Sequence, residues 1–488
     1  MKRALPLPAV LLLGACTVGP DYSRPTTPVP KAYSEPHSAA ALSDAELGSW
    51  WKGFGDEELD SLINRAIAQN LDVETAAAKI RQARAEERAA GAAALPEVST
   101  SASVTRQRIS EHAIPVPPGG GGNGGVGGGG GFGLPGSEFT TWRAGFDASW
   151  EIDLFGKTRR SVEAARARTG AALWNRRDAQ VSTAAEVASS YLELRTLQQE
   201  IALARNEVER QERSEHLVRA RVRGGLVTGQ DLEQQSSELG TARAAIPPLQ
   251  ADADVEIHKI AILTGATPEA LLADLASERA LPLAPPQVPA GLPSDLLRRR
   301  PDIRAAERNL AASTADIGVA TADLYPSFSL SAAPALVSTA LASLIEWGSR
   351  SFTAGASLDW PIFNGGRTRA NIEARNAQQE EALIAYRKTI LEALQDVEDA
   401  LVKIDNDRKG TGELEGALGS ARRAEAIARE RYAGGLVTLS DVLDAQAKRI
   451  TLEKKVVETR SAEALDTVAL YKALGGGWPE MADGGARP

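Results

Sequence analysis

The sequence predicts a mostly α-helical protein that also contributes β-strands to a membrane. Three observations support this fold class. The chain contains an internal duplication, four short segments alternate between apolar and polar residues, and long segments carry the heptad spacing of packed helices. Because the chain is duplicated, each kind of element is expected twice.

The duplication is clearest in a short glycine-containing turn. Residues 223–232 read RGGLVTGQDL, and residues 433–442, 210 positions later, read AGGLVTLSDV. Trp150 and Trp360 are separated by the same offset. Matching residues further upstream, at an offset of 230, include Asp72 with Asp302 and Pro96 with Pro326. The longer offset fits an insertion in the first repeat, where the glycine run GGGGNGGVGGGGG lies.

The composition narrows the class of protein. A chain of 488 residues is long enough for two domains or for one large repeated architecture. The formal net charge of −9 argues against a nucleic-acid-binding protein, which would present a basic stripe. Aromatic residues make up only 5% of the chain, which favours long helices over a bulky globular core.

The only cysteine, Cys16, follows a segment with the pattern of a signal peptide. Lys2 and Arg3 precede a short apolar stretch that is too short to cross a membrane as a helix. Residues 13–16 read LGAC, which resembles a bacterial lipobox and predicts cleavage before Cys16 and lipidation of its thiol. The alternative is an ordinary buried cysteine. A single cysteine excludes an intramolecular disulfide in either case.

Four segments have the period-2 pattern of amphipathic strands. Residues 142–154, WRAGFDASWEIDL, place apolar side chains at even positions and polar or small ones at odd positions. Residues 352–362 alternate in the same way, and 98–106 and 328–336 alternate more weakly. The sequence therefore predicts two β-hairpins, one in each repeat.

These strands fit a membrane barrel better than a soluble sandwich. Four strands separated by long helices cannot build a sandwich, whereas one apolar and one polar face suit a barrel wall. The smallest such barrels have about eight strands, and a bilayer tolerates no open sheet edge. The protein must therefore oligomerise if its strands span a membrane. Its aromatic residues Trp142, Trp150, Phe352 and Trp360 are then expected at the membrane interface, with core packing as the alternative.

The long helices are predicted to form two hairpins. Residues 366–432 could form about 100 Å of nearly continuous helix at 1.5 Å per residue, and 157–222 are their counterpart. Gly224-Gly225 and Gly434-Gly435 are expected to end these helices, and Thr228 and Thr438 to cap the return helices. A kink is expected at Pro247-Pro248 in the first return helix. The twin turns then form the tips of the hairpins.

The predicted organisation follows the repeats. The expected segments are a signal peptide at 1–15, a lipid anchor, extended arm and equatorial segment at 16–60, a first repeat at 61–263, an equatorial connector at 264–300, a second repeat at 301–474 and a disordered tail at 475–488.

Several motifs resemble the outer-membrane efflux family of OprM, NodT and TolC. They are CTVGPDY from Cys16, WEIDLFG at 150–156, LRRRPDIRAAE at 297–307, WPIFNGGR at 360–367 and RYAGGLVTLSDVLDAQ at 431–446. The resemblance covers almost the whole mature chain. It implies a TolC-like trimer, in which each protomer gives four strands to a 12-stranded β-barrel and long helices to a periplasmic α-barrel.

The resemblance also implies a function. Proteins of this kind are the outer-membrane exit duct of a tripartite pump, with a periplasmic adaptor and an inner-membrane transporter as partners. Transport of drugs or other small molecules through the duct is passive. Thr17 after the lipidated Cys16, rather than Asp, is consistent with sorting to the outer membrane.

The second hairpin tip is the candidate gate. Asp441 and Asp444 lie three residues apart, hence on one helix face, and three copies would form carboxylate rings that favour cations. TolC-like proteins have aspartates at these positions, and Tyr432 matches a position in their gating network. The position that usually holds Arg is Val437, so the closed-state network must differ. The alternative is that the aspartates only favour a solvated helix N-terminus.

The tips are also the candidate contact with the adaptor. The resemblance implies that this contact uses exposed residues of both turns. These are Gly224, Gly225, Leu226, Val227, Gly434, Gly435, Leu436 and Val437. The alternative for the glycines is helix capping alone.

No constellation of catalytic residues is recognisable. The four histidines are scattered and form no helical metal-binding pair, and the sole cysteine is assigned to the anchor. Neither an enzyme nor a cofactor beyond the lipid on Cys16 is expected. The main alternative function is a periplasmic adaptor lipoprotein, which should have one hairpin flanked by lipoyl and soluble β domains. A coiled-coil scaffold lipoprotein is a third class, but it leaves the strand alternation unexplained.

Overall fold

A computed structural model describes most of the chain. The described residues are 17–34, 43–108, 110, 138–285 and 288–478. The predicted signal peptide, Cys16, the glycine run and residues 479–488 lie outside them. The described chain divides into two compact units. One comprises Met1–Ser23, Arg84–Ala167 and Ala311–Glu381, and the other Arg24–Ala83, Arg168–Leu310 and Ala382–Pro488.

Helices dominate the element order. The longer helices are α2 (Glu57–Gln69), α3 (Leu71–Ala92), α4 (Lys157–Arg223), α5 (Gly229–Ala244), α6 (Ile246–Leu263), α9 (Pro301–Ala322), α10 (Arg367–Ala433) and α11 (Leu439–Ala473). The short ones are α1 (Asp44–Gly48), η1 (Trp50–Phe54), η2 (Pro268–Leu271), α7 (Leu272–Leu275), α8 (Pro293–Arg299), η3 (Leu341–Ser343) and η4 (Trp347–Ser349). No described helix is both long enough and apolar enough to cross a membrane.

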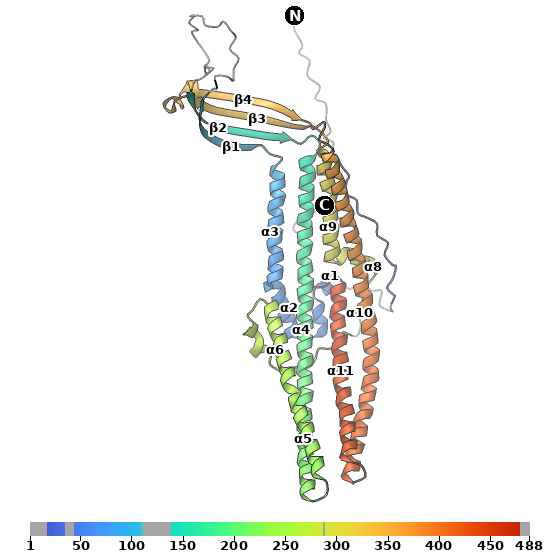
Figure 1. Cartoon of the computed structure of the whole chain (residues 1–488). Helices are drawn as coiled ribbons and strands as arrows, with labels where there is room; N and C mark the ends of the chain where they lie inside the picture. Colours follow the sequence, from blue (N-terminus) through green and yellow to red (C-terminus); the bar gives the residue numbers. More distant parts are fainter. Residues whose placement is uncertain (1–16, 35–42, 109, 111–137, 286–287, 479–488) are drawn as a thin grey trace, which may run out of the picture. The chain divides into compact units, whose positions relative to one another are not determined.

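The first unit contains one antiparallel sheet of four strands. These are β1 (Glu97–Arg108), β2 (Glu138–Ile152), β3 (Ser327–Ser338) and β4 (Arg350–Asp359), and they lie side by side in chain order (Figure 1). The mostly helical fold class with two β-hairpins is therefore confirmed in the protomer. The strands that were expected to continue to residues 154 and 362 end at Ile152 and Asp359.

The sheet keeps the predicted separation of faces. Val98 pairs with Ala148, and Trp150 pairs with Leu330, so that apolar residues lie opposite one another across neighbouring strands. Phe146 and Phe352, at even positions of β2 and β4, are 59% and 71% exposed. One face of the sheet is thus apolar and open in the single chain.

The duplication extends to the lengths of two pairs of matching helices and to a side-chain contact. Helices α3 and α9 each have 22 residues, and α4 and α10 each have 67. The indole nitrogen of Trp150 donates to the carbonyl of Ala94 at 2.9 Å, and that of Trp360 donates to the carbonyl of Leu324 at 3.0 Å. The two repeats therefore share even this side-chain contact.

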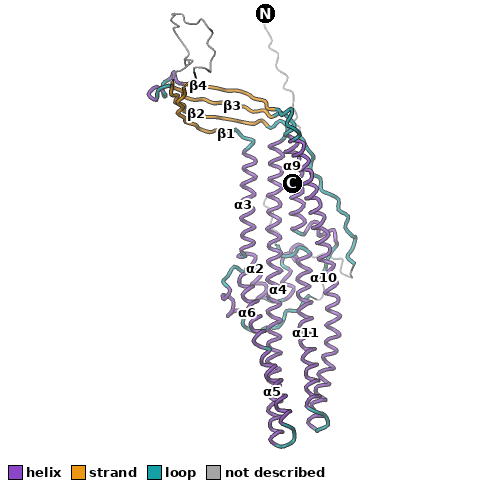
Figure 2. The backbone as a smooth tube through the Cα atoms, viewed as in Figure 1, coloured by secondary structure: helices purple, strands orange, loops and turns teal. Residues whose placement is uncertain are grey.

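The second unit contains both helical hairpins. Figure 2 shows the turns that join α4 to α5 and α10 to α11 at the same end of the helices. The expected kink is present, because α5 ends at Ala244 and α6 starts at Ile246, directly before Pro247-Pro248.

A buried arginine joins α4 to the predicted connector. Arg195 is fully buried, binds Glu58 at the start of α2 and donates to the carbonyl of Ser277 at 2.9 Å. Arg279 of the connector also pairs with Glu58 at 3.2 Å. The predicted connector thus contacts Glu58 of α2, whereas the predicted domain boundaries stay predictions.

Candidate functional site

Each hairpin turns through a glycine in the left-handed conformation. Gly225 has φ +70° and Gly435 has φ +73°. The amide of Leu226 donates to the carbonyl of Arg221, and that of Leu436 donates to Arg431, both at 2.9 Å. These bonds close the helix ends as in a Schellman motif. Glycine is needed here because other residues are strained at positive φ.

The leucines after these glycines are the exposed part of the tips. Leu226 and Leu436 are each 76% exposed. Val227 and Val437 are only partly exposed, so the expectation that all four aliphatic residues are open is correct only for the leucines. Gly224 and Gly434, the first glycine of each pair, are exposed.

Thr438 and Asp441 form a capping box at the start of α11. The Asp441 carboxylate accepts hydrogen bonds from the Thr438 amide at 2.8 Å and from its hydroxyl at 2.6 Å. Asp441 is exposed to solvent, and these two hydrogen bonds lower the pKa of its carboxyl. Thr228 and Asp231 form the same box at the start of α5. The expected N-caps are therefore present, and Asp441 has a structural role beside any role in a gate.

Asp444 lies one turn further along α11 and is exposed. Within the part of the chain that the structure describes, its carboxylate makes no hydrogen bond or ion pair, in contrast to that of Asp441. Of the two aspartates, Asp444 is therefore the one whose carboxylate is not committed to capping its own helix.

Tyr432 contacts an arginine of the other hairpin. The Arg221 guanidinium lies over the Tyr432 ring, 4.7 Å from its centroid. Its nitrogens donate to the carbonyls of Tyr432 at 3.4 Å and Ala433 at 3.5 Å. The side chain of Arg221 thus joins the two tips. Position 437, where the resemblance led us to expect an arginine, holds a valine. No sequence pattern pointed to Arg221, although the duplication predicts two equivalent tips.

A second polar contact between the hairpins lies deeper in the helices. Arg449 of α11 is 5% exposed and binds Glu425 of α10, Glu453 of α11 and Glu207 of α4, the last at 2.7 Å. Burial alone would lower the pKa of Arg449, but the three carboxylates raise it. The heptad pattern alone could not reveal this cluster, because its members come from three helices.

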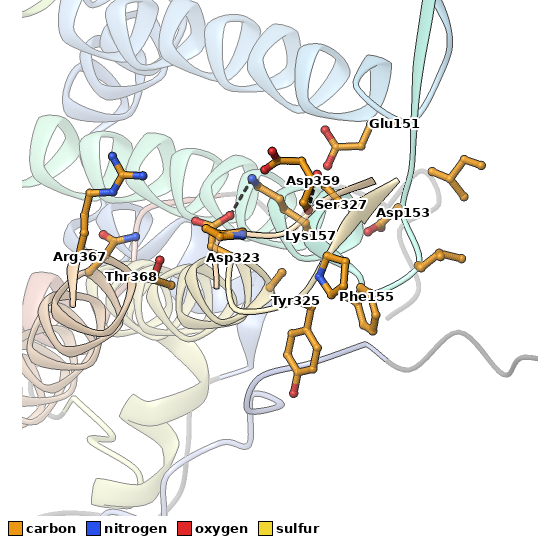
Figure 3. Close-up of a pocket in the computed structure, with 16 residues that line it drawn as sticks. Glu151, Asp153, Phe155, Lys157, Asp323, Tyr325, Ser327, Asp359, Arg367 and Thr368 are labelled. Carbon is orange, nitrogen blue, oxygen red and sulfur yellow. Dashed lines mark hydrogen bonds and ion pairs between the residues drawn. The ribbon is translucent and has the colours of Figure 1, made fainter. Parts of the chain in front are cut away.

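A cavity of about 580 Å³ lies where the strands of the first unit meet the helices (Figure 3). The Lys157 ammonium pairs with Asp323 at 2.8 Å, and Phe155 stacks on Tyr325 with 4.7 Å between ring centroids. Pro361 and Asp359, at the end of β4, line the same cavity. The cavity is thus built from both repeats.

The chain that follows Cys16 is bound to the start of α4. The buried Arg160 guanidinium donates to the carbonyl of Val18 at 3.2 Å and to the carboxylate of Asp21 at 2.6 Å. A side chain at Gly19 would place its Cβ 2.4 Å from the Cα of Gly318. The segment after Cys16 is therefore held by hydrogen bonds to Arg160 and packs closely against Gly318. Cys16 itself lies outside the described residues.

The predicted interface aromatics are all on or next to the sheet. Trp150 is 37% exposed and Trp360 is 53% exposed, and each anchors its indole nitrogen as described above. Trp142 is half-buried, whereas Phe352 is largely open. An exposed ring with a satisfied N–H suits the interface between lipid and water. Among the described residues, no group of three His, Cys, Asp or Glu could hold a metal ion.

Comparison with known proteins agrees with this architecture. A family model described as "Outer membrane efflux protein" matches residues 62–266 and 292–476. The chain is 35% identical over 495 residues to the pyoverdine export outer membrane protein OpmQ of Pseudomonas aeruginosa, covering 100% of this chain and 99% of that protein. It is 31% identical over 475 residues to nodulation protein T of Rhizobium leguminosarum bv. viciae, covering 96% and 92%.

Solved structures agree at the level of the whole fold. The outer-membrane channel OprN superposes with a TM-score of 0.84 at 32% identity, covering 95% of this chain and 100% of that chain. The match includes sheet and helices alike, because it extends over nearly the full length of both proteins.

Proposed function

This chain belongs to the outer membrane efflux protein family, and from that premise we propose that three copies form the exit duct of a tripartite pump. The observation that carries the proposal is the four-stranded sheet with an apolar face and two open edges, β1 and β4. Four strands are too few to close a barrel in a bilayer, and twelve from three copies are enough.

The protein resides in the outer membrane and extends into the periplasm, as its family does. We assign its membrane attachment to a lipid on Cys16, and the segment that follows Cys16 is bound by Arg160. Two or more acyl chains would anchor it stably, where one would not. A periplasmic adaptor and an inner-membrane transporter are the proposed partners, and drugs or other small molecules are the proposed cargo. OpmQ, by its name, exports pyoverdine.

The proposal assigns no chemical step to the protein. Transport through the duct is passive, and its energy comes from the inner-membrane partner. The lipid is the only non-protein group assigned, and no cofactor or metal takes part.

The gate is assigned to the second hairpin tip, with Asp444, Asp441 and Tyr432. Carboxylate rings from three copies would favour cations at a narrow opening. Asp441 supplies charge while it caps α11, and the exposed Asp444 supplies charge without that role. The stack of Arg221 on Tyr432 supports a contact that holds the two tips together, with arginine provided by the first hairpin.

The adaptor contact is assigned to both turns. Leu226 and Leu436 support this assignment, because each presents an apolar side chain to solvent beside a hydrogen-bonded glycine turn. An apolar group on a fixed backbone loses little conformational entropy on binding, which suits a docking point.

Single-channel conductance of the purified protein in a planar bilayer tests the proposal. Discrete openings with a preference for cations are expected. A folded protein that never conducts and stays monomeric under chemical crosslinking would contradict it and favour the adaptor alternative. A folded trimer that does not conduct would instead indicate a closed gate.

A further inference from the structure

We propose that β4 of one copy pairs with β1 of the next copy in the register that the internal duplication dictates. In this register Ser357 lies opposite Ser103 of the neighbouring copy, and β4 lengthens to Ile362. The inference rests on the trimer of the proposed function, and it identifies which residues meet at the interface between copies.

The strand pairing within each repeat has one register. In the first repeat Glu97 pairs with Ser149, and in the second Ser327 pairs with Asp359. Equivalent residues of β1 and β3 are 230 positions apart, and equivalent residues of β2 and β4 are 210 positions apart. These are the offsets of the sequence repeat. Strands β1 and β3 have 12 residues each, with no insertion. The offsets therefore relate the strands residue by residue.

The pairing between repeats is seen once in the chain, at β2 and β3. Ala148 pairs with Ala332, and Trp150 pairs with Leu330. In a ring of three copies, six repeats follow one another, and every second junction joins β4 to β1 of the next copy. An equivalent environment at each junction requires an equivalent register. Each β2 residue has its equivalent 210 positions later in β4, and each β3 residue has its equivalent 230 positions earlier in β1. The two internal pairs therefore correspond to Leu358 with Ala102 and Trp360 with Thr100 across copies.

The faces of the strands agree with this register. It places Leu358 opposite Ala102 on the apolar face, and Ser357 opposite Ser103 on the polar face. A slip by one residue would put polar residues opposite apolar ones along the whole strand. Every residue of β1 and of β4 is exposed in the single chain, so both edges are open to a partner.

The early end of β4 supports the same pairing. Strand β2 continues to Ile152, three residues beyond Ser149, its last partner for β1. Those three residues pair only with β3, in which Ile152 meets Phe328. The equivalent residues 360–362 have no strand beside them in one chain, and β4 stops at Asp359. Ile362 is 86% exposed. Strand β1 of the next copy would supply the missing partner.

One irregularity of the internal junction should be absent between copies. The β2–β3 ladder skips the pairs of Phe146 with Pro334 and of Asp147 with Ala333, and Pro334 has no N–H to donate. The equivalent position in β1 is Val104, which has a full backbone donor. As far as Asp359, the junction between copies can therefore form a continuous ladder, whereas Pro361 in the lengthened strand has no N–H to donate.

Cysteine crosslinking of the full chain tests the register. Directly paired residues have Cα atoms about 4.5–5.5 Å apart, within the range that a disulfide spans. In S357C/S103C, mild oxidation should produce a covalent trimer on a non-reducing gel. The bond must join two copies, because β1 and β4 of one chain are separated by two strands, about 14 Å in total. The wild type, which has only Cys16, should give no crosslink.

Two further variants serve as matched controls. S357C/S101C and S357C/S99C combine the same β4 cysteine with serines of β1 on the same face. Four residues of strand shift Ser99 by about 14 Å along the sheet, so S357C/S99C should stay uncrosslinked. S357C/S101C, a diagonal pair, should crosslink at least tenfold more slowly than S357C/S103C.

The outcomes separate the register from the trimer. An amine-reactive crosslinker, used on the same samples under reducing conditions, reports the trimer independently. A trimer that crosslinks best in S357C/S101C or S357C/S99C, or in none of the three, overturns the register while leaving the proposed function intact. Monomers throughout would overturn both.

Discussion

At the scale of single residues, two aspartates of the second hairpin tip have different structural roles, although the sequence does not distinguish them. Asp441 and Asp444 share one helix face, but only Asp441 closes a capping box with Thr438. Its twin Asp231 does the same in the first hairpin, which indicates that this aspartate is needed wherever the turn occurs. The local turn therefore explains Asp441 in part, whereas it does not explain Asp444.

This difference predicts distinct effects on ion selectivity and stability. Asp444→Asn should weaken the cation preference with little loss of stability, and Asp441→Asn with Asp444→Asn should weaken it further. Replacing Asp441 should also destabilise the start of α11, because it weakens the capping box with Thr438. The reversal potential in a salt gradient measures the preference. Asp231→Asn is the control for capping alone, and unchanged selectivity in the double variant would remove both aspartates from the gate.

A second residue-scale prediction concerns pH. Burial and the nearby Asp466 raise the pKa of Asp407 on α10 to about 6, with Glu463 adding repulsion and Lys403 opposing it. A carboxyl with a raised pKa binds extra protons in the folded state. Its contribution to stability is full at low pH and is lost as pH rises through about 6.

Asp407→Asn should therefore raise the melting temperature at pH 7.5, and the gain should shrink as the pH falls to about 5. Asp399→Asn, at an exposed aspartate on the same helix, is the matched control. Thermal unfolding followed by circular dichroism measures both. An equal gain at both pH values would refute the assignment to Asp407.

At the scale of elements, the turns depend on the backbone more than on side-chain contacts. A Cβ at Gly435 would meet no atom within 4 Å, so any effect of a substitution must come from its positive φ. The same holds for Gly225. The repeated GGLVT motif is thus explained by chain geometry in both hairpins.

Gly435→Ala should accordingly destabilise the tip by about 1 kcal/mol. Gly412→Ala, at an exposed position inside α10, should instead stabilise the helix by about 1 kcal/mol. Hydrogen exchange of the turn amides measures the local effect, with faster exchange expected only in Gly435→Ala. If both variants behaved alike, the turn would not depend on the left-handed glycine.

At the scale of the whole molecule, the conducting and docking functions should be separable. Leu226→Asp with Leu436→Asp changes two exposed side chains at the tips, and neither is needed for folding. Efflux in cells should fall at least tenfold, because the adaptor loses its apolar contact, while conductance of the purified protein stays. Leu283→Asp, which is 70% exposed in the connector, is the control. Normal efflux in the double variant would exclude the leucines from docking.

Much of this organisation was predictable from the sequence because it depends on neighbours along the chain. Period-2 alternation located four strands, but their predicted ends are wrong by one to four residues, because pairing with another strand decides the length. Glycine and threonine at fixed spacing located both turns and caps. The duplication, once recognised, even relates the strand registers of the two repeats.

Contacts between distant segments were decided only by the tertiary structure. Arg221 stacks on Tyr432, and Arg449 gathers carboxylates from three helices, although no spacing in the sequence connects them. Local periodicity shows which face of a helix is buried, but it does not show which residue of another helix lies against it. That choice depends on the rotation and height at which the helices pack, and these are set by the folded chain as a whole.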